Sequence, residues 1–321
     1  MAYRLGIDLG GTKILGVVFA ADGRVLGSDK QRTRADDGYP AVLRRLVEVA
    51  RNAVDAAGLS WGRHIDALGM GVPGPVSADA RELLGATNLG WGPTALAADF
   101  EALCPEVRVV LGNDVNMGAL GEARQGCATD VASAFALFVG TGLGGALIRD
   151  GAVVAGTRGM AGEIGHVPAP FGQRQCGCGQ LGCLETVASK VGLEQLVREF
   201  TAAEVACLLD PGGGGPLKSK AIRRAYDDGC EATRKAIKLM ARALAWAVVN
   251  VTAVADPECF ILGGGLGERF GDVLIRRMRK YLERYPFFAP PSAFDIRTAA
   301  LGDHAVAAGA AWTAAAGPGR S

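Results

Sequence analysis

Apolar residues recur along this chain either in strand-like runs or at helical spacing. The changes from one pattern to the other predict where its strands and helices lie. Over residues 3–32 they indicate a strand, a glycine turn, a second strand, an Asp-Gly turn at 22–23 and a third strand. Asp-Gly between β-branched runs favours a hairpin. Residues 40–57 carry apolar side chains at helical spacing, and Gly58 is expected to end that helix.

The hairpin pattern returns in the middle of the chain. Residues 133–159 again predict a strand, a glycine-rich turn, a strand, an Asp-Gly turn at 150–151 and a strand. The spacing between the glycine turn and the Asp-Gly turn is nearly the same as in the first hairpin. This echo indicates two domains of one design, although spacing alone leaves a chance match open.

The remaining segments alternate between strands and helices. Strands are expected at the starts of 65–77 and 107–124, and the second of these continues into a helix from about Val115. Further expected elements are helices over 186–209, 217–255 and 302–317, a flexible surface loop at 210–216, and a strand that runs through three glycines into a helix over 259–270. This alternation predicts an α/β fold with mixed sheets and two lobes.

Composition and charge narrow the class of protein. With 321 residues, 49% of them hydrophobic, the chain can build one large domain or two smaller ones. A net charge of +1 without a long basic run argues against nucleic-acid binding. No signal peptide is read, and the apolar stretch 243–257 falls short of the roughly 18–20 residues of a membrane span. We therefore expect a cytoplasmic protein without membrane contact, whose cysteines are reduced.

Three glycine-rich turns follow apolar strands. They contain Asp8, Gly10, Gly11, Thr12 and Lys13; Gly140, Thr141, Gly142 and Gly144; and Gly263, Gly264 and Gly265. Glycine lets successive backbone N–H groups approach an anion, so these turns are candidate phosphate sites, with ordinary strand turns as the alternative. None of them is a Walker A loop or a convincing dinucleotide fingerprint. Asp8 is a candidate to hold Mg²⁺ through water, and Thr12 or Lys13 to meet a phosphate oxygen.

Asn113 and Asp114 lie at the end of a predicted strand. A carboxylate in this place suits a reaction site better than a core, because a buried unpaired aspartate is costly. The alternative is an N-cap for the helix at 115, and the two roles are compatible.

Three cysteines gather in the stretch RQCGCGQLGCLE, residues 174–185. Cys176, Cys178 and Cys183, with His166 ten residues ahead of the first, supply a complete Cys₃His set for tetrahedral zinc. A disulfide is disfavoured by the reducing compartment, and the C-x-x-C redox motif is absent. Four protein ligands leave no position for water, so the zinc is expected to be structural.

Two glutamates flank this set. Glu163 precedes His166 by three residues, and Glu185 follows Cys183 by two. They either orient the metal-bound imidazole or accept hydrogen bonds from a ligand rich in hydroxyl groups.

Six motifs occur in order across residues 6–265: GIDLGGTK, GND, GTGLGG, AGEIGH, CGCGQLGCLE and ILGGG. On these motifs the chain resembles the ROK family (repressor, open reading frame, kinase), and within it most closely the bacterial glucokinases. The resemblance covers nearly the whole chain, and EIGH followed by CxCGxxGCxE is highly specific. It implies the actin-like, ribonuclease H-like fold of sugar kinases, with two α/β lobes, a cleft between them, and assembly as a homodimer or homotetramer.

The resemblance also implies boundaries and roles. The small lobe would span 1–115 and be completed by the C-terminal helix at about 301–321, and the large lobe would span 116–300 and carry the zinc loop 166–183. Asp114 matches the general base, and the glycine turns match the phosphate and adenosine loops. The residues that match sugar contacts are Asn88, Asn113, Glu163, His166 and Glu185, and those that match the zinc set are His166, Cys176, Cys178 and Cys183.

The implied activity is transfer of phosphate from ATP, with Mg²⁺, to the 6-hydroxyl of glucose. Kinases for N-acetylglucosamine, N-acetylmannosamine, mannose, fructose and allose share most of these motifs, and polyphosphate replaces ATP in some relatives, so the preferred hexose and donor stay open. A repressor of the family would carry a helix-turn-helix domain before the first glycine turn, where seven residues precede Asp8. A non-catalytic sugar-binding protein would not need Asp114 and three phosphate turns.

Overall fold

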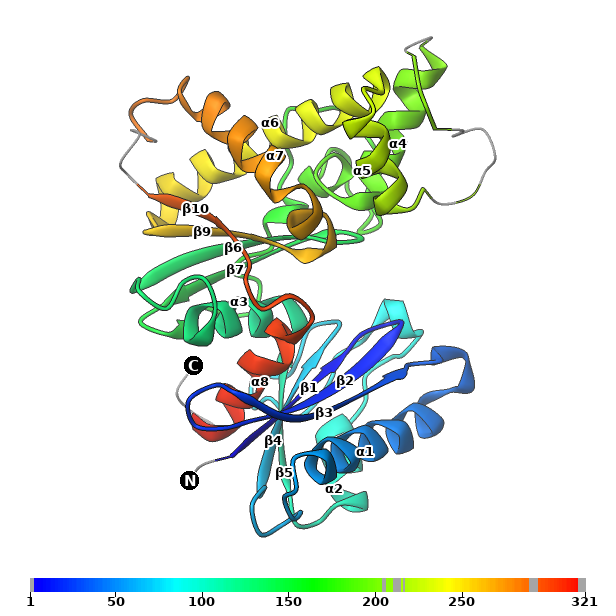
Figure 1. Cartoon of the computed structure of the whole chain (residues 1–321), viewed down its shortest axis with the longest axis vertical. Coiled ribbons are helices and arrows are strands. Elements are labelled where there is room, and N and C mark those ends of the chain that lie inside the picture. Colours follow the sequence, from blue (N-terminus) through cyan, green and yellow to red (C-terminus); the bar gives the residue numbers. More distant parts are fainter. Residues whose placement is uncertain (1–2, 204–205, 210–214, 216, 289–293, 317–321) are drawn as a thin grey trace. The chain divides into compact units, whose positions relative to one another are not determined.

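The computed structural model describes residues 3–203, 206–209, 215, 217–288 and 294–316. Its contacts divide the chain into two compact units (Figure 1). The first contains residues 1–130, 147–161 and 303–321, and the second contains 131–146 and 162–302.

The first unit is built on a five-stranded sheet in the order β3-β2-β1-β4-β5. Strands β1 and β2, and β2 and β3, are antiparallel, as the predicted hairpins require, whereas β4 and β5 add in parallel. The strands are β1 (Arg4–Leu9), β2 (Lys13–Phe19), β3 (Val25–Arg32), β4 (Ala67–Val72) and β5 (Arg108–Asn113).

Helices cover both faces of this sheet. They are α1 (Tyr39–Ala56), α2 (Leu96–Leu103), α3 (Asp114–Gln125) and α8 (Ala305–Ala316). A Cβ atom on Gly6 would meet the backbone of α8, whereas one on Gly16, which pairs with Ile7, would meet Val49 of α1. Neighbouring residues of a strand point to opposite faces, so α1 and α8 lie on opposite sides of the sheet.

The second sheet has the order β10-β9-β6-β7-β8. Its strands are β6 (Ser133–Val139), β7 (Leu143–Arg149), β8 (Ala152–Val153), β9 (Cys259–Gly263) and β10 (Asp295–Thr298). Helix α7 packs on β6, β9 and β10, α6 packs on α7, and α4 and α5 pack against these helices. The helices are α4 (Lys190–Ala202), α5 (Ser219–Asp227), α6 (Glu231–Ala255) and α7 (Gly264–Leu282).

The two sheets share one topology. Read from β8, the second order is 8-7-6-9-10, which matches 3-2-1-4-5 position by position. In both sheets a hairpin precedes strands that add in parallel. The repeated turn spacing therefore reflects a repeated architecture. The third strand of the second copy is shorter than expected, because β8 has only two residues.

Helix α3 belongs to the first unit, whereas the sequence expectation began the second lobe at residue 116. The reason is its packing against α8. A Cβ atom on Gly309 would lie 1.8 Å from the Met117 carbonyl oxygen, and one on Gly121 would lie 2.2 Å from that of Ala305. These glycines let the two helix backbones touch, so the boundary follows long-range packing.

Two helical segments after residue 186 differ from the expectations. The segment 186–209 is shorter as a helix, because α4 covers only Lys190–Ala202. The segment 217–255 is split into α5 and α6. The predicted loop 210–216 lies outside the described residues except for Gly215.

Helix α6 is long and apolar enough to cross a membrane, by length and composition only, over a stretch of 18 residues. Within the structure, however, 61% of that stretch is buried. It is therefore a core helix, as expected for the apolar stretch 243–257.

Candidate functional site

The first glycine turn connects β1 to β2 and is closed by a hydrogen bond from the Gly10 N–H to the Lys13 carbonyl, 2.9 Å. Thr33, the residue that follows β3, fixes this turn, since its hydroxyl donates to the Gly10 carbonyl at 2.6 Å and its N–H donates to the Thr12 carbonyl at 3.0 Å. Arg45 of α1 in turn donates to the Thr33 carbonyl. The turn is thus held in one shape from two neighbouring elements.

Asn88 lies against this turn. It is an exposed residue of a short 3-10 helix, Thr87–Leu89. A Cβ atom on Gly11 would lie 3.3 Å from the Asn88 carbonyl oxygen. The structure thus brings together two candidates that the sequence separates by more than seventy positions.

Asp8 is buried at the end of β1, with 9% of its surface exposed. Burial raises the pKa of this carboxyl to about 7, with Asp114 and Asp303 adding to the rise and Lys13 opposing it. A cation placed here would reverse the effect of burial, because it favours the ionised carboxylate. Asp8 is therefore suited to bind a cation, because the bound cation would convert the protonated acid into the carboxylate.

Asp303 binds two lysines, Lys13 at the start of β2 and Lys30 in β3. Its carboxylate accepts hydrogen bonds from Lys13 Nζ at 2.5 Å and from Lys30 Nζ at 2.8 Å. These bonds, the one from Lys13 foremost, lower the pKa of Asp303 to about 2. Lys13 therefore has a fixed partner on the loop that opens α8.

Asn113 and Asp114 have different local roles. Asn113 is the N-cap of α3, because its side-chain oxygen accepts from the Asn116 N–H at 3.1 Å. Its amide group donates to the Gly74 carbonyl at 3.3 Å and to Asp114 Oδ1 at 3.2 Å. Asp114 is half-buried at the first position of the helix, one residue earlier than expected, and its Oδ1 accepts from the Val115 N–H at 2.9 Å. The cap is thus Asn113, and the Asp114 carboxylate is oriented by the amide beside it.

The second glycine turn joins β6 to β7 and is closed by a hydrogen bond from Gly140 N–H to the Gly142 carbonyl, 3.0 Å. Glu185 sits on this turn, since its Oε2 accepts from the Leu143 N–H at 3.3 Å. A Cβ atom on Gly142 would lie 2.6 Å from that same oxygen. The N–H of Lys190, at the start of α4, donates to the Gly140 carbonyl at 2.9 Å. This turn is therefore built together with Glu185.

The third glycine turn ends β9 and begins α7 at Gly264. Gly264 has φ +75°, and a Cβ atom there would lie 2.8 Å from the Val139 carbonyl oxygen. This contact places the start of α7 beside the end of β6. The N-terminus of a helix offers free N–H groups and a positive dipole end to an anion.

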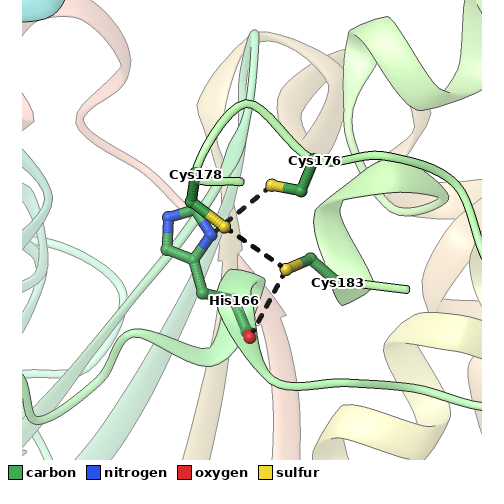
Figure 2. Close-up of side chains that lie close together, drawn as sticks. All are labelled: His166, Cys176, Cys178 and Cys183. Atoms are coloured by element: carbon green, nitrogen blue, oxygen red, sulfur yellow. Dashed lines mark hydrogen bonds between the residues drawn. The ribbon is translucent and has the colours of Figure 1, made fainter. Parts of the chain in front are cut away.

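Four side chains converge in the loop that precedes α4 (Figure 2). The ligand atoms of His166, Cys176, Cys178 and Cys183 all lie within 4.8 Å of one another. His166 ends a 3-10 helix, Ile164–His166, and Cys183 precedes another, Leu184–Thr186. Cys176 and Cys178 lie on a tight turn closed by hydrogen bonds from Cys176 N–H to the Gln180 carbonyl, 2.9 Å, and from Gly179 N–H to the Cys176 carbonyl, 3.0 Å.

The spacing of these atoms fits tetrahedral zinc. Zinc–sulfur bonds of about 2.3 Å place two thiolates about 3.8 Å apart. The Cys178 and Cys183 sulfurs are 3.6 Å apart, and Cys176 Sγ is 3.7 Å from His166 Nδ1. His166 thus turns Nδ1 to the cluster, which leaves Nε2 for another partner.

The thiols differ in acidity. A backbone hydrogen bond from Gln180 lowers the pKa of Cys178 to about 7, whereas burial raises the pKa values of Cys176 and Cys183. Zinc binds thiolates, so loading this set must release protons from the two buried thiols.

Glu185 connects the cluster to the second glycine turn. Its Oε1 accepts from the Cys176 thiol at 3.0 Å and lies 3.8 Å from His166 Nδ1, while Oε2 accepts from the turn. Glu163 is exposed just before the 3-10 helix of His166, whose N–H donates to the Glu163 carbonyl at 3.1 Å. The predicted residues thus form one group in each unit, with Asp8, Asn88, Asn113 and Asp114 in the first and Glu163, His166, Glu185 and the cysteines in the second.

The structure adds residues that the sequence reading missed. Thr33 and Asp303 hold the first turn and its lysine, and Arg174 ties the zinc loop to α4 through hydrogen bonds of 2.9 and 2.5 Å to Glu199. Arg174 opens the cysteine-rich stretch itself, so its charge in that position was a sequence signal that could have identified it. Asp303 carries no local signal, because its partners lie about 290 and 273 positions away.

Comparison with known proteins gives consistent likenesses. The ROK family profile matches residues 4–316. A glucokinase from Streptomyces coelicolor is 31% identical over 318 residues, covering 97% of each chain. An N-acetyl-D-glucosamine kinase from Shigella flexneri is 32% identical over 272 residues, covering 81% of this chain and 83% of that protein. A solved ROK family glucokinase from Streptomyces griseus, in complex with glucose and AMPPNP, has a TM-score of 0.82 and 28% identity, covering 98% of this chain and all of that one.

Proposed function

Because the chain belongs to the ROK family and has its two-lobed, actin-like α/β sugar-kinase fold, we propose that it transfers the γ-phosphate of ATP to the 6-hydroxyl of glucose. The observation that carries this proposal is the position of Glu185. This residue follows Cys183 of the Cys₃His set by two positions, and its Oε2 accepts from the Leu143 N–H of the glycine turn 140–143. The loop that we propose to bind sugar hydroxyls thus contacts the turn that we propose to bind phosphate.

Asp114 is the proposed general base. Its carboxylate is held at the start of α3 by the Asn113 amide and the Val115 N–H, which fixes the direction of its lone pairs. A positioned base contributes about 10²–10⁴-fold to the rate, and holding the hydroxyl in line with the phosphate contributes roughly 7–11 kcal/mol. The carboxylate would take the proton of the 6-hydroxyl as the oxygen attacks phosphorus.

The remaining sugar hydroxyls would be held by Asn88, Asn113, Glu163, His166 and Glu185. Ionised carboxylates accept hydrogen bonds from hydroxyl groups, and the amide and the imidazole offer directional partners. The cluster fits structural zinc, which would be held by His166, Cys176, Cys178 and Cys183. It would fix the loop on which His166 and Glu185 stand, and the chemistry would remain with the protein side chains.

The nucleotide would use the three glycine turns. The N–H groups of Gly10, Gly140 and Leu143 already have partners within the protein, so other backbone N–H groups of turns 10–12 and 140–145 would meet the phosphate oxygens, and the start of α7 at Gly264 would offer a helix N-terminus. Mg²⁺ arriving with ATP would neutralise charge on the phosphates, and the buried carboxyl group of Asp8 would hold it through water. Lys13, held by Asp303, would keep a positive charge beside the same turn.

The choice of sugar is the sharpest test. Similarity to the N-acetyl-D-glucosamine kinase supports a second candidate, a kinase for an N-acetylhexosamine. A coupled assay with glucose, N-acetylglucosamine, N-acetylmannosamine, mannose, fructose and allose, each with ATP or polyphosphate, separates these activities. We expect the highest kcat/KM for glucose with ATP. A higher value for an N-acetylhexosamine would replace glucose as the substrate, and no transfer to any of these sugars would reject the kinase assignment.

The cellular setting follows from the same proposal. A kinase that uses ATP and reduced zinc-binding thiols works in the cytoplasm. We propose a homodimer or homotetramer there, which light scattering of the purified protein would test.

A further inference from the structure

A second pair of cysteines lies outside the zinc loop and outside the proposed reaction. Cys207 stands between α4 and α5, and Cys230 is the N-cap of α6. Their sulfurs are 3.7 Å apart. Within the described residues no further histidine or carboxylate joins them as a metal set, because the only such cluster found there is that of the zinc loop.

The backbone holds the two cysteines in register. The Ala232 N–H donates to the Ala206 carbonyl at 3.1 Å, and the Leu208 N–H donates to Cys230 Sγ at 3.3 Å. These two bonds lie on either side of Cys207. A disulfide needs the sulfurs only about 1.7 Å closer, since its bond is about 2.05 Å long.

The two thiols differ in exposure and in surroundings. Cys230 is buried, with 2% of its surface exposed, whereas Cys207 is partly exposed. The Cys230 sulfur accepts from the Thr233 hydroxyl at 3.1 Å and stands at the positive end of a 25-residue helix. Burial opposes ionisation, but the hydrogen bonds from Thr233 and Leu208 outweigh it and lower the pKa of Cys230.

We infer that Cys207 and Cys230 form a reversible redox site that closes as a disulfide when it meets a small-molecule disulfide. The Cys207 thiolate attacks one sulfur of the reagent, a bond forms between them, and the other half leaves as a thiol after taking a proton. The Cys230 thiolate then attacks the Cys207 sulfur and releases the second half as a thiol. The protein loses two hydrogens with their electrons, and the reagent gains them.

Trypsin makes this site easy to read. Cleavage after lysine and arginine places Cys207 in peptide 199–218 and Cys230 in peptide 225–234, whereas all three zinc cysteines share peptide 175–190. The zinc-loaded protein is incubated with oxidised glutathione, alkylated, digested and analysed by mass spectrometry. We expect peptides 199–218 and 225–234 to be linked, and the link to be lost on addition of a reducing agent.

Three variants sharpen the result. Cys230→Ser should retain glutathione on Cys207, because the resolving thiol is gone, and Cys207→Ser should leave buried Cys230 unmodified. Cys127→Ser, a partly exposed cysteine of the first unit, should link as the wild type does. Wild-type protein that keeps glutathione on Cys207 without the link, or that is oxidised only in peptide 175–190, would overturn the inference.

A thermal measurement tests whether the link suits the native fold. The disulfide restricts the unfolded chain, so the oxidised wild type and oxidised Cys127→Ser should melt at higher temperature than their reduced forms. Oxidised Cys230→Ser should show no such rise. A linked wild type that melts lower than the reduced protein would mean that the pair is not placed for a disulfide.

Discussion

At the scale of single residues, Asn113 and Asp114 have different roles, because Asn113 caps helix α3 and Asp114 is the candidate base. Asn113 caps α3, and its amide also donates to the neighbouring carboxylate. The N-cap of α3 is therefore Asn113 and not Asp114, which the sequence had left as an alternative. The orientation of the Asp114 carboxylate depends on hydrogen bonds within the first unit. A fixed orientation suits a group that must accept a proton at a fixed place.

Replacing Asp114 tests this assignment. Asp114→Asn or Asp114→Ala should lower kcat at least about 10³-fold, because both the base and its orientation are lost. Binding of the sugar, followed by calorimetry, should survive. Asp36→Asn, which removes an exposed carboxylate of the same unit, is the control and should leave kcat unchanged. If the Asp114 variants keep more than a tenth of the wild-type turnover, the base lies elsewhere.

Asp8 links stability to pH. Its folded pKa of about 7 lies above the ordinary value of 3.8. The folded state therefore prefers the protonated acid, so the cost of ionisation is absent below about pH 4, grows as pH rises, and is complete above about pH 7. Without Mg²⁺ this cost is on the order of 4 kcal/mol.

The expected outcome is that Asp8→Asn, measured without Mg²⁺, has a higher free energy of unfolding than the wild type at pH 8. The gap between the two should shrink as pH falls from 8 to 5, since the wild-type carboxyl becomes neutral in the fold. Denaturant unfolding at each pH measures it. A gap that stays constant over this window would contradict the raised pKa.

At the scale of elements, the loop that carries the Cys₃His cluster is closed by backbone hydrogen bonds, such as Ala169 N–H to the Gly182 carbonyl, 2.9 Å, and Leu184 N–H to the Val167 carbonyl, 3.0 Å. The Arg174–Glu199 pair ties it to α4, and the proposed zinc would add four ligands to these bonds. We expect this loop to affect sugar binding through Glu185, which also contacts the second glycine turn. Loss of the metal should therefore disturb sugar binding before it disturbs the rest of the fold.

We expect about one zinc per chain in the purified protein. Cys178→Ser should lose most of the zinc and raise the KM for the sugar more than the KM for ATP, because His166 and Glu185 lose their anchor. Cys127→Ser should keep both the metal and the KM values. Metal analysis with steady-state kinetics checks this, and a wild-type protein that binds the sugar normally without zinc would exclude the structural role.

At the scale of the whole molecule, two units with the same strand order each contribute one group of candidate residues. A ligand that binds only the folded protein stabilises it in proportion to the logarithm of its concentration. Glucose at about one hundred times its Kd should add about 2.7 kcal/mol to the free energy of unfolding. Thermal unfolding with glucose, and with a non-substrate sugar as control, measures the effect, and equal shifts for both would argue against a specific sugar site.

The local parts of this molecule could be read from the sequence because their causes are local. The glycine turns, the Asp-Gly hairpins at 22–23 and 150–151 and the Cys₃His set each lie within a short segment, so spacing and residue type suffice to find them. The buried character of the stretch 243–257 followed from its composition in the same way. The lengths of the helices after residue 186 did not follow, since their ends depend on packing.

The sequence by itself determined most of the strands and helices, the repeated hairpin and the candidate residues for sugar, phosphate and zinc. Only the tertiary structure decided that α3 packs with α8 in the first unit, that Asp303 holds Lys13, and that Glu185 joins the zinc loop to a glycine turn. The physical reason is distance along the chain. Turn chemistry and ligand spacing act between near neighbours, whereas backbone contact between two helices or a salt bridge across 290 positions exists only once the chain has packed.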